Sequence, residues 1–209
     1  MPQPPTLKTA EIFASIQGEG LRLGEATLFI RLSGCNLDCS FCDTRFALKG
    51  GVTQTTTEIL EKTLYLCRSF PAEWVCITGG EPLCQDISNL VKTLKDRGLK
   101  IQVETNGTLY RTLAVDWYTV SPKPPEYFFK PEYVEQAREI KFVVSSELEF
   151  SVLKKARADF PLKTPIFLQP QSNLKWSRDK AWTLYKQGMK EGLKNLRLGC
   201  QLHKIYGIR

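Results

Sequence analysis

Short apolar runs rich in β-branched residues alternate along this chain with longer amphipathic segments. Runs of the first kind predict strands, and segments with a 3.6-residue apolar period predict helices. We expect strands at residues 27–32, 74–77, 100–104, 117–120, 140–144, 166–168 and 195–198. We expect helices at residues 57–70, 86–97, 147–160 and 177–189. This alternation is typical of parallel βαβ units whose helices cover a sheet.

The length of the chain limits how far this pattern extends. A complete eight-unit barrel needs about 250 residues, and this chain has 209. We therefore predict an α/β fold: a shortened, incomplete (β/α) barrel of the TIM type with mostly parallel strands. No internal repeat and no Ser/Gly-rich linker marks a second domain, so residues 1–209 are expected to form a single domain.

Composition and charge exclude several classes of protein. With 42% hydrophobic and 24% charged residues the chain matches an ordinary globular protein. Its net charge of +7 is scattered, without a basic block interleaved with aromatic residues, so no nucleic acid partner is expected. The chain has neither a membrane-spanning apolar stretch nor the basic and apolar start of a secretory signal. We therefore predict a cytoplasmic protein without membrane contact.

Polar and glycine-rich clusters follow five of the predicted strands. They begin at Gly34, Thr78, Glu104, Ser121 and Gln169. In parallel α/β folds the carboxyl ends of the strands form the active face. The clusters therefore predict a site that takes both a large cofactor and a substrate.

Three of the seven cysteines lie in one loop, residues 33–44, with the spacing C-x3-C-x2-C: Cys35, Cys39 and Cys42. Three thiolates can hold three corners of a cubane iron–sulfur cluster, whereas clusters used for electron transfer usually have four cysteine ligands. The fourth iron is then open to the amino and carboxylate groups of a methionine, as in S-adenosylmethionine. A zinc site would need Cys84 or His203 as a fourth ligand, and paired C-x2-C knuckles are the usual zinc arrangement, so zinc is less favoured.

The remaining cysteines have no such motif. Cys67 on a helix and Cys76 in a strand are expected in the core, Cys200 has no assigned role, and Cys84 lies near the site without a partner. A second motif, Gly-Gly-Glu-Pro at residues 79–82, follows an apolar strand. Alone it predicts a tight turn; after a cysteine loop it also suits close approach of the main chain to a ligand.

These two motifs resemble the radical S-adenosylmethionine superfamily, whose defining spacing is C-x3-C-x-aromatic-C, with Phe41 at the aromatic position. Nearly the whole chain resembles the 7-carboxy-7-deazaguanine synthase family. The segments that carry this match are residues 13–20, 29–32, 42–44, 77–82, 103–108, 120–123, 168–170 and 203–204.

The resemblance implies a radical SAM core fold and a reaction. The family converts 6-carboxy-5,6,7,8-tetrahydropterin to 7-carboxy-7-deazaguanine with loss of ammonia, in queuosine and 7-deazapurine biosynthesis. A 5′-deoxyadenosyl radical would abstract hydrogen from C6 of the substrate and trigger ring contraction, with adenosylmethionine used catalytically. The implied cofactors are a 4Fe–4S cluster, S-adenosylmethionine and Mg²⁺.

The resemblance also implies site residues. The cluster ligands are Cys35, Cys39 and Cys42, and the protein ligand of Mg²⁺ is Thr44. The adenosylmethionine residues are Phe41, Cys42, Asp43, Gly80, Ser121, Pro122, Lys123, Gln169, Pro170, Gln171 and Ser172. The pterin residues are Ile16, Gln17, Gly18, Arg31, Thr78 and His203.

Several of these roles stay open at this point. The guanidinium of Arg31 can bind a carboxylate with two parallel hydrogen bonds. Without the resemblance, an ion pair on the exposed face of the strand is an equally good role for this residue. His203, the only histidine, is equally divided between a structural and a substrate role. Glu104 suits a strand-end hydrogen-bond acceptor as well as the site, and Arg209 stands where many family members end in proline, so it receives no role.

Partners and competing functions complete the expectations. We expect a small-molecule pterin substrate, a one-electron reductant such as a flavodoxin or ferredoxin, and a homodimer. One alternative is a radical SAM activase of a glycyl-radical enzyme, which shares the cysteine spacing. Another is a metal-stabilised RNA-binding module, for which the net charge of +7 is the only motive.

Overall fold

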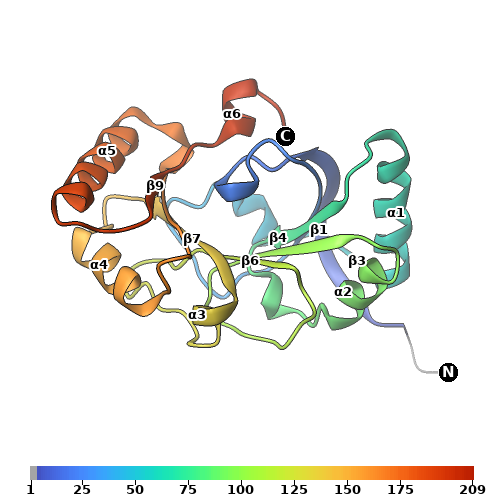
Figure 1. The fold of residues 1–209 in the computed structure, drawn as a ribbon. Coiled ribbons are helices and arrows are strands. Elements are labelled where there is room, and N and C mark those ends of the chain that lie inside the picture. The colour runs from blue at the N-terminus through green and yellow to red at the C-terminus, as the bar shows by residue number, and fades with distance from the viewer. Residues whose placement is uncertain (1–3) are drawn as a thin grey trace. The chain divides into compact units, whose positions relative to one another are not determined.

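A computed structural model describes residues 4–209 and divides into two compact units (Figure 1). The first unit holds the residues up to Ile16 together with Glu25–Thr105 and Leu109–Trp117. The second holds Gln17–Gly24, Asn106–Thr108 and Tyr118–Arg209. The single domain expected over residues 1–209 stays a prediction.

The sheet of the first unit has the strand order β3-β1-β2-β4-β5. Its strands are β1 (Thr6–Ile16), β2 (Ala26–Leu32), β3 (Val52–Thr55), β4 (Trp74–Gly79) and β5 (Lys100–Thr105). Strand β1 runs antiparallel to β2 and β3, whereas β2, β4 and β5 run parallel to one another. The carboxyl ends of β2 and β4 therefore lie side by side.

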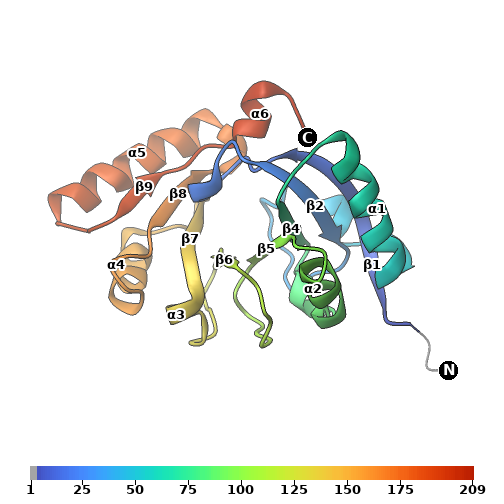
Figure 2. The ribbon, with the colours of Figure 1, turned by 45° about the vertical axis from the view of Figure 1, so that its right-hand side comes forward.

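Two helices, α1 (Thr56–Ser69) and α2 (Ser88–Lys95), pack against each other on one face of this sheet (Figure 2). Helix α1 begins at a capping box, because the backbone N–H of Glu58 donates to Thr55 Oγ1 at 3.2 Å and the N–H of Thr55 donates to Glu58 Oε2 at 2.7 Å. Every second residue of a strand points to the same face of the sheet, and those that face the helices, such as Leu28 and Ile30, are wholly buried.

The other face of the same sheet changes from apolar to polar toward the carboxyl ends of the parallel strands. Phe13 and Phe29 stack with their ring centroids 5.0 Å apart and form a buried cluster with Cys76. Two residues further along β2, Arg31 is paired with Glu11 of β1 on one side and Thr78 of β4 on the other. This polar row comes directly before the two sequence motifs.

The sheet of the second unit is parallel throughout, in the order β6-β7-β8-β9. Its strands are β6 (Trp117–Val120), β7 (Ala137–Val144), β8 (Ile166–Pro170) and β9 (Leu196–Leu198). Its helices are α3 (Tyr133–Gln136), α4 (Phe150–Asp159), α5 (Lys175–Lys190) and α6 (Leu202–Tyr206). Helices α4 and α5 pack together, and α5 lies along β7, β8 and β9. Ile140, Phe142, Leu153 and Leu168 form part of its core.

The predicted α/β architecture with mostly parallel strands is confirmed, and the sheet of each unit is open. Every strand and helix expected from the sequence is present, with ends shifted by a few residues. Sequence reasoning missed β1, β3, α3 and α6. Strand β1 was missed because its apolar residues do not alternate strictly, which reflects a register shift between Thr9 and Glu11 that changes the face of later side chains. No helix within residues 4–209 is long and apolar enough to span a bilayer.

Candidate active site

The cysteine loop, residues 33–44, leaves the carboxyl end of β2. Cys35, Cys39 and Cys42 lie outside any disulfide and are all partly exposed. The backbone N–H of Cys42 and Nη2 of Arg45 both donate to the carbonyl oxygen of Cys39, each at 3.1 Å. The three thiols are thus carried by a short loop with little regular structure, at the end of the sheet where the sequence places the site.

The glycine motif packs directly against the start of this loop. The N–H of Gly80 donates to the carbonyl oxygen of Leu32 at 3.1 Å, and the N–H of Glu81 donates to that of Gly34 at 2.8 Å. A Cβ on Gly80 would lie 2.0 Å from the carbonyl oxygen of Gly34. Because that obstacle is backbone, only glycine fits here. The fold therefore brings together two motifs that are distant in the sequence.

A buried carboxylate that sequence reasoning left without a role stabilises this junction. Glu81 is fully buried, and its Oε1 accepts hydrogen bonds from Thr105 Oγ1 at 2.8 Å and from the N–H of Leu83 at 3.1 Å. It thereby ties the end of β4 to the end of β5. The signal in the sequence is its position directly after the two glycines, inside a motif that follows an apolar strand.

The donor chemistry of the cysteine loop fits an iron–sulfur cluster. Three thiols on one loop are the ligand type that such clusters require. The thiols do not yet converge, since residues 4–209 contain no group of three or more His, Cys, Asp or Glu side chains arranged around a metal position. Metal binding commonly orders its own ligands, so a partly exposed loop can close around a cluster. Cys42 Sγ lies 3.6 Å from Thr44 Oγ1, so the expected Mg²⁺ ligand and an expected cluster ligand are neighbours.

Arg31 is found in the ion pair that the sequence left open as its alternative role. Its Nε donates to Glu11 Oε1 at 2.7 Å, and its guanidinium lies 5.7 Å from the ring centroid of Phe13 and 5.9 Å from that of Phe46. The ion pair uses Nε alone, so the two terminal nitrogens can still bind a carboxylate. Thr78 is its register partner on β4, so two expected pterin residues are neighbours.

Cys84 lies close to the cysteine loop. Its thiol accepts a hydrogen bond from the backbone N–H of Asn36, and burial together with the nearby Glu81 and Cys35 raises its pKa. The thiol is thus partly buried, although Cys84 as a whole residue is exposed; it ends the short turn Pro82–Cys84. This position agrees with the expectation that Cys84 lies near the cysteine loop.

In the second unit, Gly18 and His203 are in contact. A Cβ on Gly18 would lie 2.1 Å from His203 Nδ1, and the N–H of Leu202 donates to the carbonyl oxygen of Gly18 at 2.9 Å. Gln17, beside Gly18, is buried. The structure thus groups Gln17, Gly18 and His203, three of the expected pterin residues, whereas Ile16 ends β1 in the first unit.

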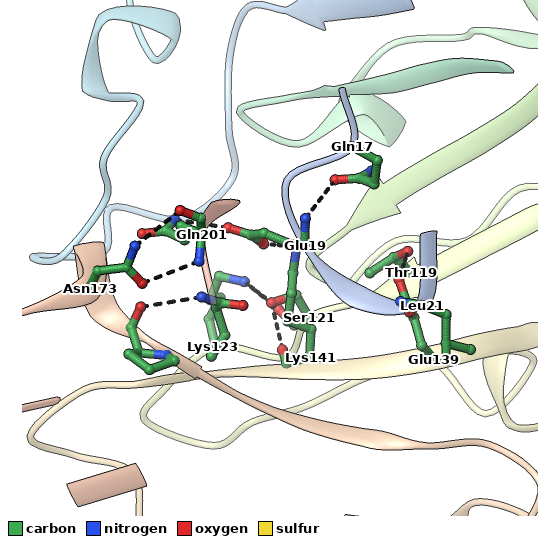
Figure 3. A network of polar contacts seen from close by, with 12 residues as sticks. Gln17, Glu19, Leu21, Thr119, Ser121, Lys123, Glu139, Lys141, Asn173 and Gln201 are labelled. Carbon is green, nitrogen blue, oxygen red and sulfur yellow. Dashed lines mark hydrogen bonds and ion pairs between the residues drawn. The ribbon is translucent and has the colours of Figure 1, made fainter. Parts of the chain in front are cut away.

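The expected adenosylmethionine residues of the second unit lie directly after β6 and at the end of β8. Ser121 Oγ donates to the carbonyl oxygen of Lys141 at 2.7 Å, and Lys123 Nζ donates to Ser121 Oγ at 2.6 Å (Figure 3). Ser121 and Pro122 are buried. These contacts fix the turn after β6 against β7.

The end of β8 and the turn that follows it, residues 169–172, offer an acceptor for a ligand. Gln169 is 2% exposed, and its Oε1 is a buried oxygen with no hydrogen-bond partner among residues 4–209. Buried polar atoms are normally paired, so this atom fits a donor on a bound molecule. Ser172 has a φ of 48°, in the left-handed region, within the turn that closes the segment. The residues present therefore fit a polar cofactor such as adenosylmethionine.

Comparison with known proteins adds a family assignment to this geometry. Residues 29–145 match the sequence profile of the radical SAM superfamily. The matched region includes the cysteine loop, the glycine motif and the turn after β6.

Relatives extend the similarity to nearly the whole chain. The chain is 36% identical to the 7-carboxy-7-deazaguanine synthase of Aquifex aeolicus, over 95% of this chain and 93% of the relative. It is 34% identical to the enzyme of that name from Synechocystis sp., over 96% and 92%. The crystal structure of QueE from Escherichia coli superimposes with a TM-score of 0.79 at 27% identity, over 95% of each chain.

Proposed function

Because the chain belongs to the radical SAM superfamily and, within it, to the 7-carboxy-7-deazaguanine synthase family, we propose that it converts 6-carboxy-5,6,7,8-tetrahydropterin to 7-carboxy-7-deazaguanine with loss of ammonia. The observation that carries this proposal is the packing of Gly80 against the first residues of the cysteine loop. That contact joins the two superfamily motifs in a chain whose relatives of this name match it almost end to end.

A radical SAM enzyme uses a 4Fe–4S cluster and S-adenosylmethionine. When bound, they supply one-electron cleavage of the sulfonium and hydrogen abstraction from the substrate. In our proposal Cys35, Cys39 and Cys42 hold the cluster. Adenosylmethionine is bound by residues 41–43, Gly80, 121–123 and 169–172, with Gln169 Oε1 available as a buried acceptor.

The chain's own side chains bind and orient the pterin in this proposal. The terminal nitrogens of Arg31 bind the substrate carboxylate while Nε stays on Glu11, so the guanidinium is fixed before the substrate arrives. Thr78 lies beside it and contributes a hydroxyl. Ile16, the backbone of Gln17 and Gly18, and the imidazole of His203 supply further contacts. Thr44 contributes its hydroxyl to a Mg²⁺ ion that takes its other ligands from water and substrate.

The substrate is a small molecule, and the enzyme takes an electron from a separate reductant. We propose a small redox protein such as a flavodoxin or ferredoxin as that reductant, a homodimer as the assembly, and the cytoplasm as the location. No nucleic acid partner is proposed, because the positive charge of the chain does not gather into a basic block.

Anaerobic product analysis tests the proposed function. The reconstituted protein is incubated with the carboxylated tetrahydropterin, adenosylmethionine, Mg²⁺ and a reductant, and products are identified by mass spectrometry. We expect 7-carboxy-7-deazaguanine and ammonia from the wild type, none from Cys42→Ala, and wild-type turnover from Cys67→Ala, whose cysteine lies on α1 and outside the three-cysteine motif. About one zinc and no iron per chain, or turnover only with a partner protein as substrate, would contradict the proposal.

A further inference from the structure

A buried polar network holds one loop of the second unit. We call residues Gln17–Gly24 the substrate loop, because it contains Gln17 and Gly18 of the proposed pterin site. Figure 3 shows side chains from β6, β7 and the C-terminal segment converging on it. The residues that make these contacts, Glu19, Glu139, Lys141 and Gln201, have no role in the proposed chemistry.

The first anchor of the substrate loop is the carboxylate of Glu19. Its Oε2 is paired with Lys141 Nζ, and its Oε1 accepts a hydrogen bond from Gln201 Nε2 at 2.8 Å (Figure 3). The side chains of Lys141 and Glu19 are only 8% and 14% exposed. Both oxygens of Glu19 are thus engaged in a site that excludes most solvent, where an ion pair fixes geometry more strongly than it does at a surface.

The second anchor is the carboxylate of Glu139, two residues before Lys141 on the same face of β7. Its Oε2 accepts a hydrogen bond from the backbone N–H of Leu21 at 2.6 Å, and its Oε1 accepts one from Thr119 Oγ1 at 2.7 Å. A Cβ on Gly20 would lie 2.4 Å from Glu139 Oε1. The loop backbone is therefore pressed against this carboxylate.

The same network reaches the C-terminal segment that carries His203. The N–H of Gln201 donates to Asn173 Oδ1 at 3.2 Å, and Asn173 Nδ2 donates to the carbonyl oxygen of Gln201 at 3.0 Å (Figure 3). The next residue, Leu202, bonds to Gly18, whose Cα faces His203. Glu19 therefore sits between Lys141 and the segment that presents the imidazole.

We propose that Lys141 is a positioning residue for pterin binding. Its ammonium fixes Glu19, and Glu19 fixes Gln201, so Gln17, Gly18 and His203 are held in one arrangement before the substrate arrives. A buried lysine–carboxylate pair usually stabilises a fold no more than well-packed apolar residues of similar volume do, so stability alone does not account for this pair. What the ion pair supplies is a defined loop geometry. This inference rests on the proposed function, since it concerns the binding of that substrate.

The test is the kinetics of Lys141→Met, which keeps an unbranched side chain, one atom shorter, and removes its charge. We expect the KM for the pterin to rise about 10- to 100-fold, the loss typical when a binding group is displaced by roughly 1 Å. Cleavage of adenosylmethionine without the pterin should stay within about twofold of wild type. Ser121 is held by the backbone carbonyl of Lys141, which the substitution retains.

A double-variant cycle separates positioning from general destabilisation. Glu19→Ala should raise the KM for the pterin as Lys141→Met does. The KM of the double variant should stay within about twofold of the higher of the two single-variant KM values, because both substitutions remove the same contact. Lys154→Met serves as the matched control. Lys154 forms an exposed ion pair with Glu191 at 3.4 Å in the same unit, and its loss should leave the KM for the pterin unchanged.

The outcomes distinguish this inference from the proposed function. If the wild type does not convert the pterin, the proposed function fails. If the wild type turns over but Lys141→Met keeps its KM, or if pterin-independent cleavage falls as much as pterin turnover, the positioning role is contradicted. Should Lys141→Met not fold, Lys141→Arg, which keeps the charge, is measured together with Glu19→Gln. A near-wild-type KM for Lys141→Arg and a raised KM for Glu19→Gln support the inference. A raised KM for Lys141→Arg with a near-wild-type KM for Glu19→Gln overturns it.

Discussion

The cysteine loop and the substrate loop are held in opposite ways. The cysteine loop, residues 33–44, is partly exposed, and the ion pair of its Asp38 with Arg45 is long, at 3.7 Å, and solvent-exposed. The substrate loop, Gln17–Gly24, is fixed by two buried or nearly buried carboxylates, Glu139 and Glu19. The cysteine loop is hydrogen-bonded to the glycine motif at its base, through Gly34, whereas the substrate loop is held by side chains at Glu19 and Leu21.

The difference follows from what each loop has to bind. A metal cluster forms strong bonds to its thiolates, so the cluster itself can order the loop that receives it. A pterin forms only hydrogen bonds and ionic contacts, and these give useful affinity when the binding groups are held in advance. We therefore expect substitutions in the first loop to act on cofactor assembly and those around the second to act on substrate affinity.

The largest effect is expected at the base of the cysteine loop. Gly80→Ala places a Cβ 2.0 Å from the carbonyl oxygen of Gly34, and neither backbone can move away without displacing the loop. We expect loss of cluster assembly and of all adenosylmethionine cleavage, measured by iron content, the visible absorption of the cluster and 5′-deoxyadenosine formation. If Gly80→Ala retains full iron content and full adenosylmethionine cleavage, the packing of the glycine motif against the cysteine loop is not required for function.

A smaller effect, confined to the substrate, is expected for Arg31→Ala. The KM for the pterin should rise about 10- to 100-fold, because a charge-assisted hydrogen bond is worth about 1.5–3 kcal/mol. Pterin-independent cleavage of adenosylmethionine should be unaffected. Glu11→Gln is the matched variant, since it weakens the ion pair and keeps the guanidinium. Equal substrate affinity in Arg31→Ala and wild type would assign Arg31 to the ion pair alone.

Gly20→Ala should disturb the substrate loop more mildly. Gly20 has a φ of 72°, which costs a residue with a Cβ about 1–2 kcal/mol, and the new Cβ would also meet the carboxylate of Glu139. We expect a lower melting temperature and a KM for the pterin raised about tenfold, with unchanged iron content. Gly24→Ala provides the comparison, because its φ of 88° is equally strained but nothing lies within 4 Å of the new Cβ. If both variants raise KM equally, the contact with Glu139 has no specific role.

The smallest effect is expected for Cys84→Ala. Cys84 is exposed as a whole residue, lies outside the cysteine loop and belongs to no part of the three-cysteine motif. Iron content and turnover should stay within about twofold of wild type, a change of less than about 0.5 kcal/mol. A drop in iron content comparable to that of Cys42→Ala would make Cys84 a cluster ligand and break the distinction between the loop and its surroundings.

The sequence predicts the parallel part of the fold better than its edge. Strands such as β4 and β8 are continuous apolar runs, because they are buried on both faces, and such runs are easy to recognise. Strand β1 is antiparallel, carries a register shift and mixes polar with apolar residues, so periodicity does not reveal it. Helix α6 is a short helix of five residues, too short to show a period.

For the site, motifs predict what touches the ligands but not what holds the loops. The cysteine spacing and the two glycines are local patterns, and the structure brings them together as the resemblance implies. Glu19 pairs with Lys141 and Gln201 across more than half of the chain. A single sequence does not show such pairs. The available signal was the presence of charged residues, Glu139 and Lys141 among them, in a strand whose second half is apolar.

One anaerobic assay tests the account most directly: the simultaneous measurement of 7-carboxy-7-deazaguanine and 5′-deoxyadenosine formed by the iron-loaded wild type, with and without the pterin. We predict 7-carboxy-7-deazaguanine only when the pterin is present, with more than one molecule formed for each adenosylmethionine consumed. Cleavage of adenosylmethionine at the same rate with and without the pterin, and no deazaguanine product, would contradict it.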